Sequence, residues 1–169
     1  MPPQKTLNQP ANMNFLSPVG YRFYIDNLPN TNWFITATSI PGISLGEAAF
    51  PGPTMDSAVP GDTLVFGGLD VTFIVDEDMS NWRELYDWMV GLTFPENYSE
   101  YKAQKAKFIY SDANLTILNS NMNPNMKIYF KDLFPTSLSD IAFDSASTDV
   151  DTIKGTVSFK YLNYTYEKL

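Results

Sequence analysis

The sequence contains neither cysteine nor histidine. The absence of cysteine excludes disulfides and thiol nucleophiles. The absence of histidine excludes the commonest general base, imidazole ligation of zinc and any Ser-His-Asp triad. Catalysis would have to rely on carboxylate pairs, lysine, tyrosine or a hard metal. We therefore expect a protein that is not an enzyme, with no catalytic residue, no cofactor and no metal site.

Long apolar runs and basic residues are also scarce. No segment approaches the roughly 20 apolar residues of a membrane-spanning helix, and residues 1–8 lack the apolar centre of a secretory signal. This predicts a protein assembled in the cytoplasm without a membrane partner. The 11 basic residues stand against 19 acidic ones, for a formal net charge of -8. That charge disfavours ordinary nucleic-acid binding. An acidic surface that serves only solubility explains the charge as well as a functional role would.

The densest group of carboxylates, Asp76-Glu77-Asp78, superficially resembles the start of a calcium-binding loop that continues to Asp87. The glycine that such a loop needs at its centre is missing, and Trp82 begins an apolar helical pattern instead. We interpret these acids as the N-terminal turn of a helix over 79–91, with Asp78 or Ser80 as its cap.

The first half of the chain alternates between strand signals and turn residues. Residues 1–18, rich in proline, asparagine and glutamine, predict an extended N-terminal arm ahead of a single domain over 19–169. Residues 20–26 and 32–39 alternate with period two and predict an antiparallel strand pair. The segment 43–62 is rich in glycine and proline, which indicates a long functional loop or an interface hairpin, with a weak strand at 55–59.

The second half adds further strands to the predicted helix. Trp82, Leu85, Tyr86 and Met89 recur at helical spacing and predict the stripe that covers a sheet. Residues 96–108 are interpreted as a loop or a short second helix. The remaining strands are expected at 63–66, 69–75, 113–119, 126–131, 138–143 and 153–166, with 113–131 forming a hairpin and an acidic loop before 153. The pattern predicts a mainly β (α+β) protein: an antiparallel β-sandwich or partly open barrel with one covering helix.

The aromatic residues are too many and too evenly placed for one small core. Trp33 and Phe34 are neighbours, so a strand would place one large ring on each face, and Tyr161, Tyr164 and Tyr166 pose the same problem at the C-terminus. Either the helix and the segment 43–62 cover both faces, or partner subunits do, which we favour. The candidate assembly residues are Trp33, Phe34, Pro41, Gly42, Leu45, Phe50, Met55, Pro60, Asp62, Tyr161, Tyr164 and Tyr166.

Several short motifs, in order along the chain, resemble the tail tube proteins of contractile-tailed, T-even-like bacteriophages. They are Ala37-Thr38-Ser39-Ile40-Pro41-Gly42, Pro60-Gly61-Asp62 with Phe66, Val71-Thr72 with Asp76-Glu77, Trp88, Leu133-Phe134-Pro135-Thr136, Phe143-Asp144, and Val157-Ser158-Phe159-Lys160-Tyr161. The resemblance implies a tail-tube-like fold in the virion tail. Members of the tail tube family form hexameric rings that stack into a tube through which DNA passes as a non-specific cargo. The implied partners are further copies of the chain and the tail sheath, baseplate and tape-measure proteins.

Three alternatives stay open from the sequence. A tube-initiating protein of the baseplate or a tube-terminating protein of the neck would share the same fold. A carbohydrate-binding β-sandwich module would also be acidic and aromatic, but it should be monomeric. An enzyme that uses carboxylates is the third, and single Asp or Glu substitutions would inactivate it without affecting assembly.

Overall fold

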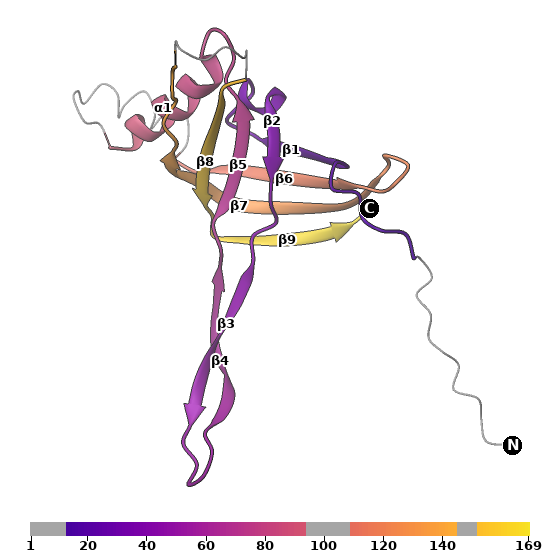
Figure 1. The fold of residues 1–169 in the computed structure, drawn as a ribbon, viewed down its shortest axis with the longest axis vertical. Helices are drawn as coiled ribbons and strands as arrows, with labels where there is room; N and C mark the ends of the chain where they lie inside the picture. The colour runs from indigo at the N-terminus through magenta and orange to yellow at the C-terminus, as the bar shows by residue number, and fades with distance from the viewer. Residues whose placement is uncertain (1–12, 94–108, 145–151) are drawn as a thin grey trace, which may run out of the picture.

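The computed structural model describes residues 13–93, 109–144 and 152–169 (Figure 1). Most of the predicted arm, the segment 96–108 and most of the acidic loop before residue 153 lie outside these ranges. The elements are β1 (Tyr21–Ile25), the 3-10 helix η1 (Thr31–Trp33), β2 (Ile35–Thr38), β3 (Ile43–Phe50), β4 (Ser57–Phe66), β5 (Leu69–Ile74), α1 (Ser80–Thr93), β6 (Ser111–Leu118), β7 (Pro124–Leu138), β8 (Lys154–Lys160) and β9 (Asn163–Lys168).

The main sheet is antiparallel and runs in the order β1-β6-β7-β8-β5-β2, with β9 also paired to β7. The long strand β7 joins two groups of strands that cross one another in Figure 1: its first half pairs with β6 and β9, and its second half pairs with β8. At the change of direction Asp132 has a φ of 54°, and its N–H donates to Asp112 Oδ1. The predicted class, a mainly β sandwich or partly open barrel with one helix, is confirmed.

The core lies between the crossing strands because alternate residues of each strand point inward. Leu69, Val71 and Phe73 of β5 are fully buried, as are Val157 and Phe159 of β8. The alternation of period two in these strands, visible in the sequence, is thus the direct cause of their burial.

Helix α1 covers one end of this core, as predicted, but Trp88 and not Tyr86 belongs to its buried face. Leu85 and Trp88 are buried, and the Trp88 ring lies 6.2 Å from that of Phe159. Tyr86, expected in the buried stripe, is exposed. The turn before the helix is held by Asp76 rather than by Asp78 or Ser80: Asp76 Oδ1 accepts from the N–H of buried Asn81 at 3.2 Å.

The prediction that the first two strands pair with each other is wrong. β1 pairs with β6, and β2 pairs with β5. The connection between them contains η1, so Trp33 belongs to a 3-10 turn instead of a strand. In that turn the Asn32 side chain accepts from the Ile25 N–H at 2.8 Å and donates to the Ile25 carbonyl at 2.9 Å. These bonds occupy the backbone groups that a directly paired second strand would have used.

Two predicted strands near the C-terminus also need correction. The strand expected at 138–143 does not form. Strand β7 ends at Leu138, and residues 139–144 belong to no strand. The strand expected at 153–166 is divided at residues 161–162 into β8 and β9. The division arises because β8 pairs with β5 and the second half of β7, whereas β9 follows the first half of β7.

Of the two structures predicted for the glycine- and proline-rich segment 43–62, a loop or a hairpin, the hairpin forms. Strands β3 and β4 pair with each other as a separate two-stranded sheet that projects from the body (Figure 1). The predicted strand 63–66 is the end of β4. Gly67 and Gly68 then lead into β5.

Candidate assembly surfaces

The hairpin β3–β4 is exposed on both of its faces. All eight residues of β3 are exposed, and only Gly61 and Phe66 in β4 are partly covered. A two-stranded hairpin is marginally stable in water by itself, and contiguous exposed apolar side chains in a soluble protein indicate a contact surface. The exposed large apolar residues of the hairpin and its turn are Ile43, Leu45, Phe50, Met55, Val59, Leu64 and Val65.

Glycines set the shape of this hairpin. The register shifts between Leu45 and Glu47, and across that irregularity a Cβ on Gly61 would lie 2.7 Å from the carbonyl oxygen of Gly46. A Cβ on Gly52, in the turn, would collide with the carbonyl oxygen of Met55. Only glycine fits such close backbone approaches. Gly61 therefore permits the register shift between the strands, and Gly52 permits the turn.

The base of the hairpin is attached to the body by aromatic side chains. The Tyr164 hydroxyl donates to the Pro41 carbonyl at 3.2 Å. The Phe66 ring lies 5.4 Å from Tyr164 and 6.1 Å from Tyr161 in edge-on geometry. Burial, with a smaller contribution from Tyr164, raises the pKa of Tyr161 to about 12. This aromatic base (Pro41, Phe66, Tyr161 and Tyr164) fixes where the hairpin leaves the body.

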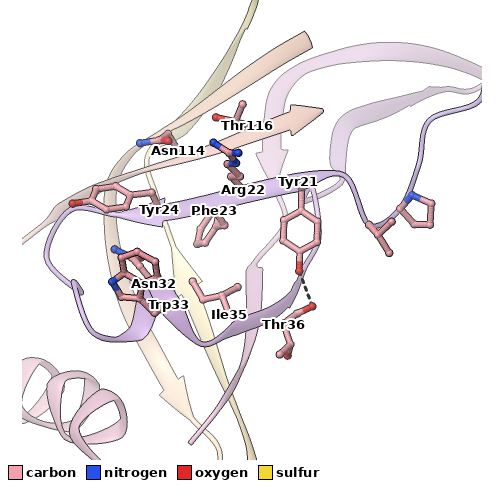
Figure 2. A pocket seen from close by; sticks show the side chains of 12 residues that line it. Tyr21, Arg22, Phe23, Tyr24, Asn32, Trp33, Ile35, Thr36, Asn114 and Thr116 are labelled. Atoms are coloured by element: carbon pink, nitrogen blue, oxygen red, sulfur yellow. Dashed lines mark hydrogen bonds between the residues drawn. The ribbon is translucent and has the colours of Figure 1, made fainter. Parts of the chain in front are cut away.

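A second surface lies where the barrel is open, between β1 and β2 (Figure 2). The two strands face each other across a hollow of about 770 Å³. One direct bond crosses it, from the Tyr21 hydroxyl to the Thr36 carbonyl oxygen at 2.6 Å. Burial raises the pKa of Tyr21. Trp33 lines the rim with 88% of its surface exposed.

The structure divides the twelve candidate residues among four places. Pro41, Tyr161 and Tyr164 belong to the aromatic base, Gly42 follows Pro41, and the two tyrosine rings pack against the core of their own chain. Leu45, Phe50, Met55, Pro60 and Asp62 lie along the exposed hairpin. Trp33 and Phe34 lie in and just after η1. Tyr166 lies on β9. Their role in contacts between subunits stays a prediction.

Sequence reasoning missed several residues of these surfaces. Ile43, Leu64 and Val65 were not among the candidate residues, although Leu64 and Val65 lie in the strand predicted at 63–66. Ile43 and Leu45 on either side of Ser44 are a short strand signal that could have located the start of the hairpin. Asn32 carries no signal in the sequence, because its role depends on the position of Ile25.

Within 13–93, 109–144 and 152–169, no three Asp or Glu side chains are grouped so that they could hold a metal ion. None of the helices found in those ranges is long and apolar enough to cross a membrane.

The chain matches the family model of the phage tail tube protein over residues 5–167. It is 30% identical over 144 residues to the tail tube terminator protein of Enterobacteria phage T4, which covers 83% of this chain and 74% of that relative.

Solved structures with a similar fold come from contractile injection systems. A chain of the PVC sheath-tube complex in its extended state has a TM-score of 0.66 at 15% identity, covering 93% of this chain and 94% of the other. The tube-terminating cap of the anti-feeding prophage has a TM-score of 0.62 at 14% identity, covering 98% and 99%. The PVC sheath/tube terminator has a TM-score of 0.65 at 16% identity, covering 92% and 99%. At these identities the likeness concerns the fold.

The family match extends over almost the whole chain, and it offers no support for the carbohydrate-binding module or the carboxylate enzyme. The exposed hairpin and the open barrel accord with it. The chain belongs to the phage tail tube protein family, whose members are structural, non-enzymatic components of the virion tail.

Proposed function

We propose that six copies of this chain form a ring and that such rings stack into the inner tube of a contractile tail, whose channel DNA crosses. The hairpin β3–β4 is the observation that carries this proposal. It projects from the body and exposes apolar side chains on both faces, so it needs a surface outside its own subunit.

A contact between the hairpin of one copy and a different surface of another copy is asymmetric, and this asymmetry supports stacking. A hairpin that docks on a different surface of the next copy makes a head-to-tail contact, which closes into a ring or continues as a filament. Sheet edges that invite open-ended pairing are removed when strands from neighbouring copies close a barrel. Both kinds of contact are needed for a tube of stacked rings.

The partners outside the ring follow from the family and the fold. A sheath would surround the tube, since a chain of similar fold occurs in a sheath-tube complex. A baseplate protein at one end and a tape-measure protein inside the channel complete the expected set. The net charge of -8 suits a channel that repels the phosphates of passing DNA and does not hold them.

A ring that ends the tube is the second candidate function. It is favoured by the 30% identity to the tail tube terminator protein of phage T4. Such a ring would dock on one end of the tube and would not add further copies of itself. A tube-initiating ring in the baseplate has no comparable sequence relative to support it.

Electron microscopy of the purified protein in negative stain tests the proposal. Rings with a central hole, or tubes built from them, are the expected result. A dispersed monomer at high protein concentration overturns it. Long tubes at rising concentration identify the repeating subunit, whereas isolated rings that cap pre-formed tubes identify the terminator.

A further inference from the structure

Strand β9 leaves one long edge of the sheet unpaired. β9 pairs with β7 on one side, and no strand of the described ranges pairs with its other side. The Leu169 N–H donates to the Asn125 carbonyl. Since backbone groups of a strand alternate in direction, the odd-numbered residues bond to β7 and the even-numbered ones, Tyr164, Tyr166 and Lys168, direct their N–H and C=O outward.

Side chains bond one residue on each of the other two edges of the main sheet. The Asn32 side chain occupies both backbone groups of Ile25 on β1, and Tyr21 bonds the Thr36 carbonyl on β2. Proteins protect exposed edges in this way against unwanted pairing. The edge of β9 carries no such protection among the described residues.

The core is also incomplete beside β9. Tyr166 pairs with buried Ile128, and Tyr164 pairs with buried Phe130, so both tyrosines lie on the core-facing side of the strand. Tyr164 is packed there, but Tyr166 has 74% of its surface exposed. A large ring on the inner face of a sheet without a cover indicates that the cover comes from elsewhere.

The hairpin and the strands at the β9 edge carry formal charges of opposite sign. The hairpin from Ile43 to Phe66 contains Glu47, Asp56 and Asp62 and no basic residue, a formal charge of -3. The paired segments 126–131 and 163–168 contain three lysines and one glutamate, a formal charge of +2 in a chain of -8. The lysines are Lys127, Lys131 and Lys168.

We infer that the free edge of β9 receives the hairpin β3–β4 of a second copy, which adds a strand to the sheet and covers Tyr166. This inference rests on the assembly proposed above and identifies the receiving surface. The hairpin has strand edges of its own that no strand in the described ranges covers, and its apolar side chains can pack against the exposed ring of Tyr166. Main-chain bonds supply affinity in strand addition, and the lysines select an acidic strand.

Single thiols test the contact, because the chain has no cysteine of its own. Ala48→Cys in the hairpin and Thr165→Cys on β9 are both exposed positions, and Asp87→Cys on α1 is an exposed control. A mixture of the first two variants, treated with a short bismaleimide, should give the mixed dimer at least about tenfold more than a mixture of Ala48→Cys with the control.

Charge reversal provides a second, independent measurement. Lys131→Glu with Lys168→Glu should raise the protein concentration needed for assembly about tenfold at low salt, and Glu47→Lys with Asp62→Lys in the same chain should restore it. Arg83→Glu with Lys154→Glu makes the same change of charge at exposed sites away from β9 and should have little effect.

The outcomes separate this inference from the proposed function. Rings in the microscope without mixed dimers above control, or without rescue by the reversed hairpin, overturn the β9 contact alone. Mixed dimers without rings support the contact and overturn the ring. A monomer with neither rings nor mixed dimers overturns both.

Discussion

The hydroxyl of Tyr164 donates a hydrogen bond to the carbonyl oxygen of Pro41 and so joins the last strand to the start of the hairpin. Tyr164→Phe should lower the free energy of unfolding by about 1 kcal/mol, since one hydrogen bond is lost while the ring stays packed. Urea denaturation measures the change. Tyr166→Phe, on the exposed ring two residues later, should change it by less than about 0.5 kcal/mol. Equal effects of the two variants would contradict the anchoring role.

Gly61→Ala should disrupt assembly because its Cβ would lie 2.7 Å from the Gly46 carbonyl and distort the hairpin. The body should keep its stability, since the hairpin forms a separate sheet. Gly68→Ala is the matched control, because the nearest atom to a Cβ there is the Phe159 carbonyl oxygen at 3.8 Å, an ordinary contact distance. Sedimentation velocity measures assembly. Normal assembly of Gly61→Ala would show that the shape of the hairpin is irrelevant.

Phe130→Ala and Trp33→Ala should separate folding from assembly. Phe130 is fully buried, so its truncation should cost about 3–5 kcal/mol of unfolding free energy. Trp33 is almost fully exposed, so its truncation should cost less than about 0.5 kcal/mol. We expect it to weaken ring formation instead. Thermal denaturation and electron microscopy of both variants provide the measurements, and an unstable Trp33→Ala would be the contrary result.

Stability should fall with rising pH between about 10 and about 12. The pKa of Tyr161 is raised to about 12 in the folded state, against 10.0 for an ordinary tyrosine. In that window the folded state keeps a proton that the unfolded state has lost, so unfolding becomes more favourable as pH rises. Tyr161→Phe should reduce the slope of unfolding free energy against pH. An unchanged slope would show that Tyr161 ionises normally.

Removal of residues 1–18, or replacement of 43–62 by a short turn, should block assembly and leave the monomer folded. The replaced part of the hairpin contributes no residue to the buried core. Circular dichroism should therefore report a β-rich, folded protein, while electron microscopy reports no rings. An unfolded product would contradict this separation of folding from assembly.

The sequence predicted the elements whose signals are local. The alternation in β5 and β8, the turn between β6 and β7, and the apolar stripe of α1 depend only on residues close in the chain. The fold class followed from these elements together with the family resemblance.

What it did not predict depends on distant partners. The pairing of β1 with β6 and of β2 with β5 is decided by the whole sheet and by bonds such as that from Asn32 to Ile25. Glycines at 46, 52 and 61 left a loop and an interface hairpin both open, because the close backbone approaches within the hairpin are visible only in the structure. The contacts of Tyr161 and Tyr164 with Phe66 at the hairpin base were not visible in the sequence, because Phe66 is distant from them along the chain.

The pairing of β1 with β6 has a consequence for biosynthesis. β1 ends at Ile25, but β6 begins at Ser111, so the ribosome must deliver the hairpin and the helix before the first strand meets its neighbour. At translation speeds of about 5–20 residues per second this wait lasts on the order of several seconds. During that interval the nascent chain exposes Phe23 and Ile25, and overproduction in a foreign host should favour inclusion bodies unless translation is slowed or chaperones are supplied.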